Sequence, residues 1–207
     1  IVDSFVNSSS NALARIREII NLSFPEKKKY LNFIKGDLRD YDFLKEIFSS
    51  QYKIGKPITG VIHFAGLKAI NESIYQPLKY WEFNLLTTIN LLNVMDLYGC
   101  KTIVFSSSAS VYGSSNKDLI FEDQKLDPIN PYGLTKLSIE NLLRNLYESA
   151  SRDWKIINLR YFNPIGAHPS GLIGEVPSGL PNNIFPLIMQ AALGNIEVLK
   201  IYGKDWP

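Results

Sequence analysis

The sequence predicts an α/β fold built on a doubly wound parallel sheet. Three observations support this prediction. Strand-like and helix-like segments alternate along the chain. The strand-like segments, such as residues 58–64 and 101–105, are almost continuously apolar, which is typical of strands buried on both faces. Small or hydroxyl-bearing residues follow these strands directly, and open parallel sheets bind ligands at the carboxyl ends of their strands.

The first part of the chain alternates short strands with helices. Residues 1–3 are apolar up to an aspartate, residues 31–36 alternate in polarity, and residues 58–64 form an apolar run, so each predicts a strand. Helices are predicted over residues 11–21 and 40–48, because apolar side chains recur there three or four positions apart.

The later part continues the same alternation. Apolar periodicity predicts a long helix, a strand, a helix opened by a proline, and another strand; a loop rich in Gly, Pro and Ser, a helix and a short strand follow. In chain order these segments are residues 77–98, 101–105, 131–147, 154–161, 166–179, 182–193 and 197–202.

Composition restricts the class of protein. The chain has 207 residues, 45% hydrophobic and 20% charged, with a formal net charge of +2, which fits a globular protein and gives no nucleic-acid signal. No apolar run is long enough for a membrane span. Cys100 has no second cysteine to pair with, and His63 and His168 lack metal-ligand spacing. We therefore expect a cytoplasmic protein without a metal site and without a nucleic-acid or membrane partner.

Tyr132 and Lys136 are the first candidate catalytic residues. If Pro131 opens a helix, the two side chains lie on one face about one turn apart. A free phenol has a pKa of about 10, but a fixed ammonium nearby favours the phenolate and lowers the pKa of the phenol. Such pairs also occur by chance on helices without function. The Ser108 hydroxyl, at the end of the preceding strand, favours the catalytic interpretation because it would hold a substrate oxygen beside Tyr132.

The chain resembles the extended short-chain dehydrogenase/reductases and, among them, the UDP-glucose 4-epimerase (UDP-galactose 4-epimerase) family. The resemblance covers essentially the whole chain, and its motifs are residues 63–69, 106–113, 131–136, 159–171 and 181–183. The first three fit the wider superfamily, whereas the last two are more specific to the epimerases. Residues 87–88 are Thr-Thr where many members have Gly-Thr, a difference that we interpret as neutral.

The resemblance implies NAD-dependent inversion at C4 of a UDP-hexose, UDP-galactose to UDP-glucose, through a transient 4-keto sugar. Tyr132 would take the proton of the 4-hydroxyl, Lys136 would lower the pKa of Tyr132 and hold the nicotinamide ribose, and Ser108 would hydrogen-bond the reacting oxygen. The implied cofactor contacts are Asp3, Ser4, Asn7, Ser8, Asp37, Leu38, Phe64, Ala65, Gly66, Lys68, Asn84, Tyr132, Lys136 and Phe162. The implied substrate contacts are Lys68, Ser108, Tyr132, Asn163, Asn182 and Asn183.

Three of these positions have plainer interpretations. Asp3, which would bind the adenosine ribose and favour NAD over NADP, also suits a turn or a helix cap. Asp37, which would lie over the adenine, also suits the N-cap of the helix over residues 40–48. Lys68 also suits an ordinary exposed position.

The resemblance also predicts the domain organisation. Residues 1–165 would be a Rossmann-like dinucleotide-binding domain without its first strand and Gly-rich loop, and residues 166–207 the beginning of a small substrate domain. The first strand is central in that fold, so the strand at residues 1–3 should not pair with the strand at residues 58–64. Residues 1–207 alone are then expected to be poorly soluble or partly unfolded, to bind NAD weakly and to be inactive. The intact protein is expected to be a homodimer that binds a UDP-sugar.

Other functions remain open from the sequence. A nucleotide-sugar 4,6-dehydratase needs an acidic pair after the catalytic hydroxyl residue, and this chain has Ala109 and Ser110 there. An epimerase for UDP-glucuronate or UDP-xylose is harder to exclude. A non-catalytic nucleotide-binding module is disfavoured because Ser108, Tyr132 and Lys136 are all present.

Overall fold

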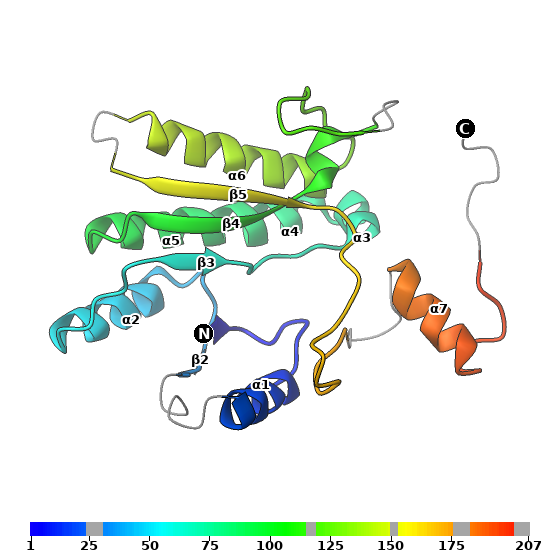
Figure 1. Ribbon diagram of the computed structural model, residues 1–207. Coiled ribbons are helices and arrows are strands. Elements are labelled where there is room, and N and C mark those ends of the chain that lie inside the picture. Colours follow the sequence, from blue (N-terminus) through cyan, green and yellow to red (C-terminus); the bar gives the residue numbers. More distant parts are fainter. Residues whose placement is uncertain (24–30, 115–118, 150–152, 176–182, 201–207) are drawn as a thin grey trace. The chain divides into compact units, whose positions relative to one another are not determined.

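The larger part of the chain is a mixed α/β arrangement with parallel strands (Figure 1). The computed structural model describes residues 1–23, 31–114, 119–149, 153–175 and 183–200. No helix among these residues has the length and apolar character needed to cross a membrane.

The described chain divides into two compact units. The larger unit holds residues 2–4 and 34–162, and the smaller unit holds residue 1, residues 5–33 and the chain from residue 163 onward. The predicted domain boundary between residues 165 and 166 stays a prediction.

The strands among the described residues of the larger unit form two separate parallel sheets. β1 (Val2–Asp3) pairs with β2 (Ile34–Lys35), and β3 (Val61–His63), β4 (Thr102–Ser108) and β5 (Lys155–Tyr161) form a second sheet in the order β3-β4-β5. The parallel pairing confirms the predicted fold class. Within the described residues β1 is not paired with β3, as expected if another strand belongs between them in the fold.

Helices cover one face of the three-stranded sheet (Figure 1). α2 (Tyr41–Lys53), α5 (Thr87–Leu97) and α6 (Pro131–Tyr147) pack with β4 around a common apolar core. Side chains alternate along β4, so every second residue faces these helices. The core consists of Leu44, Phe48, Leu91, Leu92, Val94, Met95, Cys100, Ile103, Phe105, Ile139, Leu143 and Trp154.

The opposite face of this sheet carries exposed apolar side chains. Ile62 is 66% exposed and Ile157 is 56% exposed, and both lie in register with Val104 of β4. The nearly continuous apolar strands predicted a sheet with helices on both faces. Within the described residues of the larger unit, helices cover only one face of this sheet.

The predicted helix over residues 77–98 is interrupted. α4 (Pro77–Tyr80) leads into one π-helical segment, η2 (Trp81–Leu86), before α5 begins, and a further helix, α3 (Ile70–Tyr75), precedes α4. A π-helical turn has i→i+5 hydrogen bonds in place of i→i+4 bonds and is frequent at functional sites. Here it contains the buried Asn84, whose contacts are described below.

The described residues of the smaller unit include two helices, α1 (Asn11–Ser23) and α7 (Ile184–Ala192). In this unit the ring centroids of Phe5 and Phe33 lie 5.1 Å apart. Residues 166–175 contain neither helix nor strand, as predicted, and 176–182 lie outside the described residues. The strand predicted over residues 197–202 is wrong for its described part, because residues 197–200 are irregular. So short an apolar segment does not form a strand without a neighbouring strand to supply its hydrogen bonds.

Candidate active site

Ser108 ends β4, and its position follows from the turn after it. Residues 109–112 form a single 3₁₀ turn, η3 (Ala109–Tyr112), capped by the Ser108 side chain. The Ser108 Oγ accepts a hydrogen bond from the Ser110 amide at 3.2 Å and lies 3.1 Å from the Ser110 Oγ. The hydroxyl therefore stands at the carboxyl end of the central strand of this sheet, where ligands bind in parallel sheets.

Tyr132 and Lys136 lie on the first turns of α6, as the spacing predicted. Pro131 occupies the first turn, and the Asn130 side chain caps the helix by accepting a hydrogen bond from the Gly133 amide at 2.8 Å. A Cβ atom at Gly133 would lie 2.8 Å from the Ser110 carbonyl oxygen. Glycine at this position therefore allows the start of α6 to pack closely against the turn after Ser108.

Lys136 is held at the end of β4, near the ring of Tyr132. It is 5% exposed, and its Nζ donates to the Ser106 carbonyl oxygen at 2.8 Å. The same nitrogen lies 4.9 Å from the ring centroid of Phe105 and 5.8 Å from that of Tyr132. The serine, the tyrosine and the lysine are thus brought together at one strand end.

Burial controls the protonation of this group. It lowers the pKa of Lys136 to about 8 and raises the pKa of Tyr132, while a hydrogen bond with Ser108 acts on the pKa of Tyr132 in the opposite, lowering direction. We expected the lysine to lower the pKa of the tyrosine. In the structure the lowering influence comes from Ser108 instead, and burial outweighs it, so the pKa of Tyr132 lies above its ordinary value.

The loop after β3 lies against the same lysine. Gly66 has a φ of +152°, and a Cβ atom there would lie 2.9 Å from the Asn84 Oδ1 and 3.8 Å from the Lys136 Nζ. Asn84 accepts a hydrogen bond from the Leu67 amide at 2.8 Å and donates to the Thr135 Oγ1 at 3.0 Å. Predicted as a cofactor contact, Asn84 is seen here to fasten this loop to α6.

The predicted adenosine contacts follow β1 and β2. Asp3 ends β1 and is in register with Lys35, so Asp3 and Asp37 lie at the same edge of the two-stranded sheet. The N-cap of α2 is Asp40, whose side chain accepts from the Phe43 amide at 3.0 Å. Asp37 is therefore not the cap of that helix.

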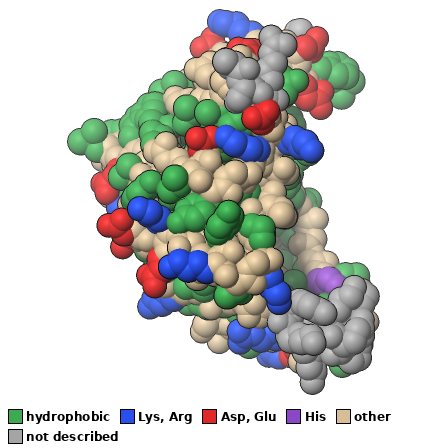
Figure 2. Space-filling model, turned by 90° about the vertical axis from the view of Figure 1, so that its left-hand side faces the viewer, with side chains coloured by type: hydrophobic (Ala, Val, Ile, Leu, Met, Phe, Trp, Pro, Cys, Tyr) green, Lys and Arg blue, Asp and Glu red, His purple; other side chains and the backbone are tan. Residues whose placement is uncertain are grey.

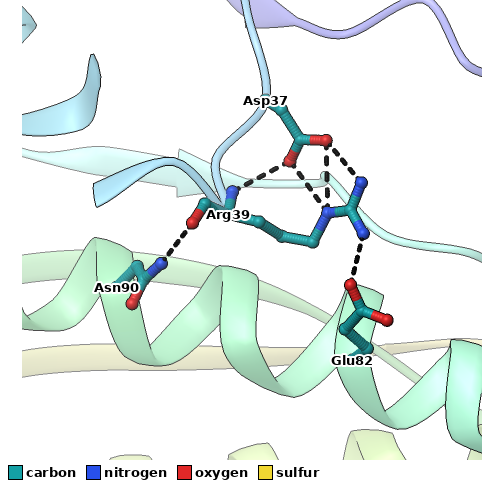
Figure 3. A network of polar contacts seen from close by, with 4 residues as sticks. All are labelled: Asp37, Arg39, Glu82 and Asn90. Carbon is teal, nitrogen blue, oxygen red and sulfur yellow. Dashed lines mark hydrogen bonds and ion pairs between the residues drawn. The ribbon is translucent and has the colours of Figure 1, made fainter. Parts of the chain in front are cut away.

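Arg39 holds the Asp37 carboxylate in place (Figure 3). Its Nη2 donates to the Asp37 Oδ2 at 2.8 Å, its Nη1 donates to the Glu82 Oε1 at 2.7 Å, and its guanidinium carbon lies 3.6 Å from the ring centroid of Phe83. Its carbonyl oxygen accepts from the Asn90 Nδ2 at 2.7 Å. The hydrogen bond from Arg39 holds the pKa of Asp37 below its ordinary value, so the carboxylate is ionised.

The remaining predicted residues are divided between the two units. In the larger unit, Phe64 and Phe162 are each 60% exposed, and their rings approach those of Tyr161 and Tyr112, respectively. Ser4, Leu38, Ala65 and Lys68 belong to the same unit. Asn7, Ser8, Asn163 and Asn183 belong to the smaller unit, and Asn182 lies outside the described residues.

The structure adds residues that the sequence analysis missed. Tyr80, fully buried, accepts from the Ala69 amide at 3.0 Å and donates to the Glu72 Oε2 at 2.9 Å. Ser73 accepts from the Tyr132 amide at 3.2 Å. The spacing of residues 69–80 gave no sign of these contacts, because they depend on how α3 and α4 meet the start of α6.

A cavity of about 300 Å³ lies elsewhere, between α6 and β5. Glu140, Arg144 and Arg160 are among its lining residues, and Tyr132 is not. The three candidate catalytic residues therefore lie outside this cavity.

The residues of the larger unit suit a dinucleotide such as NAD. Asp3 offers a carboxylate at the end of a strand, where it can accept hydrogen bonds from ribose hydroxyls. Phe64, Ala65 and Gly66 form an exposed stretch of small or flat residues after β3, and the Lys136 ammonium lies beside Gly66. Among the described residues, no group of three His, Cys, Asp or Glu side chains is placed to hold a metal ion.

Comparison with known proteins agrees with this arrangement. A family model described as GDP-mannose 4,6 dehydratase matches residues 2–206. The chain belongs to this family. Its relatives include the UDP-glucose 4-epimerase of Bacillus subtilis (strain 168) and the bifunctional UDP-glucose 4-epimerase and UDP-xylose 4-epimerase 1 of Pisum sativum. Each is 46% identical over 207 residues, which is 100% of this chain and 57% of the relative.

Solved structures of similar proteins share the fold. The UDP-glucose 4-epimerase from Bifidobacterium longum in complex with NAD⁺ and UDP matches with a TM-score of 0.88 and 41% identity, over 99% of this chain and 58% of that one. The enzyme from Stenotrophomonas maltophila, with bound NAD and formylated UDP-arabinopyranose, matches with a TM-score of 0.89 and 38% identity, over 100% and 58%. These similarities confirm the resemblance to the UDP-glucose 4-epimerases. The chain spans about 57% of the length of the curated relatives described above.

Proposed function

We propose that the protein containing this chain is an NAD-dependent UDP-hexose 4-epimerase that interconverts UDP-galactose and UDP-glucose. The observation that carries the proposal is the grouping of Ser108, Tyr132 and Lys136 at the end of β4. The relatives named as UDP-glucose 4-epimerases support it.

Each of the three residues has a distinct task in this proposal. Tyr132 accepts the proton of the sugar 4-hydroxyl through its phenol oxygen and returns it at the end of the reaction. Ser108, hydrogen-bonded to Tyr132, holds the same sugar oxygen. Lys136 contributes positive charge beside the ring of Tyr132 and, on the exposed side of Gly66, a donor for the nicotinamide ribose. NAD, when bound, supplies the hydride acceptor and donor at C4.

Removing the phenol oxygen tests this proposal. In the full-length protein, Tyr132→Phe should lower the turnover of UDP-galactose to UDP-glucose by at least about 10²-fold, because the proton acceptor is lost. A coupled assay for UDP-glucose measures the rate, and Tyr147→Phe, on the exposed end of the same helix, serves as the matched control. A wild-type rate in the Tyr132 variant would exclude the assigned role of Tyr132.

A dehydratase function is the second candidate, because the family model carries that description. The residues after Ser108 argue against it. Ala109 has no ionisable side chain, and the amide and hydroxyl of Ser110 are both bonded to the Ser108 hydroxyl, which caps the 3₁₀ turn. Epimerisation of UDP-xylose or UDP-glucuronate is compatible with the same catalytic group, and the name of the Pisum sativum relative includes UDP-xylose.

We also propose the finer roles of the binding residues. Asp3, Ser4, Asn7, Ser8, Asp37, Leu38, Phe64, Ala65, Gly66, Lys68, Asn84, Lys136 and Phe162 would contact NAD, and Lys68, Ser108, Asn163, Asn182 and Asn183 the UDP-sugar. Amide side chains suit sugar and phosphate oxygens because they bind them without a net charge.

A cytoplasmic homodimer completes the proposal. Exposed apolar side chains on α5 and α6, among them Leu97 and Leu134, support a second copy as the partner. On the face shown in Figure 2, Lys and Arg side chains lie interspersed with Asp and Glu side chains. Mixed charge on this face differs from the basic stripe that is typical of nucleic-acid-binding surfaces.

A further inference from the structure

An ion pair between the buried Glu140 and the part-buried Arg160 involves the same helix and strand as the candidate catalytic residues. Glu140 is 5% exposed, and it accepts from Arg160 at two points: Nε to Oε1 at 3.0 Å and Nη2 to Oε2 at 2.8 Å. Ser107, which is 2% exposed, donates its hydroxyl to the Glu140 Oε1. The Arg160 Nη1 donates to the Tyr112 Oη and to the Glu122 carbonyl oxygen, each at 2.9 Å.

These residues belong to the same elements as the catalytic group. Glu140 follows Lys136 by four positions on α6, and Lys136 follows Tyr132 by four, so the three side chains lie along one side of the helix. Ser107 lies between Ser106, whose carbonyl binds Lys136, and Ser108. The pairing of β4 with β5 places Arg160 in register with Ser107.

Stability alone does not account for this arrangement. Burying an ion pair removes much of its charge from water, and a well-packed apolar pair of similar volume is often as stable or more stable. What such a pair adds is geometry, because a forked guanidinium fixes both carboxylate oxygens in one orientation. Here the carboxylate joins α6 to β4 at the residue before Ser108.

We propose that Glu140 and Arg160 are positioning residues that lock α6 against the carboxyl end of β4 through Ser107, and that as a neutral pair they leave Lys136 as the charge that acts on Tyr132. This inference rests on the proposed function for the catalytic roles of Tyr132 and Ser108. The contacts among Ser107, Glu140 and Arg160 do not depend on it.

Variants that remove one charge of the pair should shift the pKa of Tyr132, which a purely structural role would not do. Glu140→Gln leaves the positive charge of Arg160, and Arg160→Met leaves the negative charge of Glu140. Glu140 lies eight residues beyond Tyr132, a rise of about 12 Å. At that separation, the pKa of Tyr132 should fall by roughly half a unit in the first variant and rise by a similar amount in the second.

The titration is measured on the full-length protein by NMR of ¹³C-labelled tyrosine, with the Tyr132 signal assigned by its absence in Tyr132→Phe. The other groups that face Tyr132 are Lys136 on the same helix, Ser108 at the end of β4, and Tyr80, which is hydrogen-bonded to Glu72. They are the same in every variant. The double variant Glu140→Gln/Arg160→Met, which restores neutrality, should bring the pKa of Tyr132 back toward its wild-type value.

Ser107→Ala tests the positioning itself, because it keeps both charges. It should raise the pKa of Tyr132 by loosening the hydrogen bond from Ser108, and it should lower turnover by about 10-fold or more while NAD affinity changes less than about 3-fold. Lys125→Met is the matched control, since its partner Asp127 lies on the surface and the pair is highly exposed. It should change neither quantity.

The outcomes separate the two proposals. Opposite shifts in the single variants, with an upward shift in Ser107→Ala, support the positioning role, even if the wild-type protein shows no epimerisation and the proposed function fails. If the pKa of Tyr132 shifts in the same direction in both single variants, or does not shift in folded variants, the inference is overturned. The proposed function is unaffected by that outcome. If the single charge variants do not fold, the same titration of Ser107→Ala and of the double variant decides the question. An unchanged pKa of Tyr132 in Ser107→Ala then overturns the inference.

Discussion

At the scale of single residues, His63 shows how burial fixes a protonation state. It is 2% exposed, and its Nε2 lies 2.9 Å from the Thr88 Oγ1, which itself donates to the Asn84 carbonyl oxygen at 2.7 Å. Because the threonine proton is already used, the histidine nitrogen must be the donor, which assigns the neutral Nε2–H tautomer. Burial, together with the charge of Lys136, lowers the pKa of His63 to about 3.

This histidine should make the fold sensitive to acid. Between pH 6.5 and pH 3 the unfolded chain binds a proton at His63 and the folded chain does not, so the free energy of unfolding falls as the pH falls. From pH 7.5 to pH 5 the loss should be about 2 kcal/mol. His63→Gln should remove that part of the pH dependence in urea unfolding, whereas His168→Gln, at an exposed position, should not. An unchanged pH dependence in His63→Gln would contradict the assigned neutral state.

The sequence predicted those site residues whose side chains are brought together by a fixed spacing within one helix. The separation of Tyr132 and Lys136 along a helix predicted both, and the same step of four leads to Glu140, whose partners lie on other elements. Arg160 and Ser107 meet through the register of two strands far apart in sequence. No local pattern contains that register, so their contact was not predictable from either segment.

At the scale of elements, Arg39 joins the segment after β2 to the π-helical segment η2 (Figure 3). Its ion pair with Asp37 is half-buried, whereas Glu82, its partner on η2, has a side chain that is 57% exposed. Since exposed ion pairs add little to stability, the two contacts should differ in their effect.

Two substitutions compare these contacts. Arg39→Met leaves Asp37 without its donor and should lower the free energy of unfolding by about 1–3 kcal/mol, with weaker NAD binding because the carboxylate loses its fixed orientation. Glu82→Gln should change the free energy of unfolding by at most about 0.5 kcal/mol. Urea unfolding and calorimetric NAD titration measure the two effects. Equal effects of the two variants would show that Asp37 does not depend on Arg39.

Element type was predicted better than element length. The strands at β1 to β5 and the helices α1, α2, α6 and α7 were all expected, but β2 covers only Ile34–Lys35 of the six residues predicted. A strand extends as far as its neighbour supplies hydrogen bonds, and β1, its partner, has two residues. The π-helical segment η2 was missed for a related reason: it follows from how Asn84 meets Leu67 and Thr135 rather than from local propensity.

At the scale of the whole molecule, the two separate parallel sheets follow the order expected of a dinucleotide fold. The topology was predictable because a strand-helix alternation with parallel pairing leaves few possible arrangements. The arrangement of the two compact units was not predictable from the sequence, because the contacts that define each unit lie within that unit.

The reaction of the full-length protein should leave the sugar hydroxyls intact. Dehydration would require an acid and a base beside Ser108 to expel the C6 hydroxyl as water, and Ala109 and Ser110 offer neither. Incubation with UDP-glucose should therefore give only the mass of the starting sugar nucleotide, redistributed between UDP-glucose and UDP-galactose. Mass spectrometry checks this, because loss of water would lower the mass by about 18 Da. Accumulation of a 4-keto-6-deoxy product would overturn the choice of an epimerase over a dehydratase, whereas UDP-glucose and UDP-galactose as the only sugar nucleotides would support it.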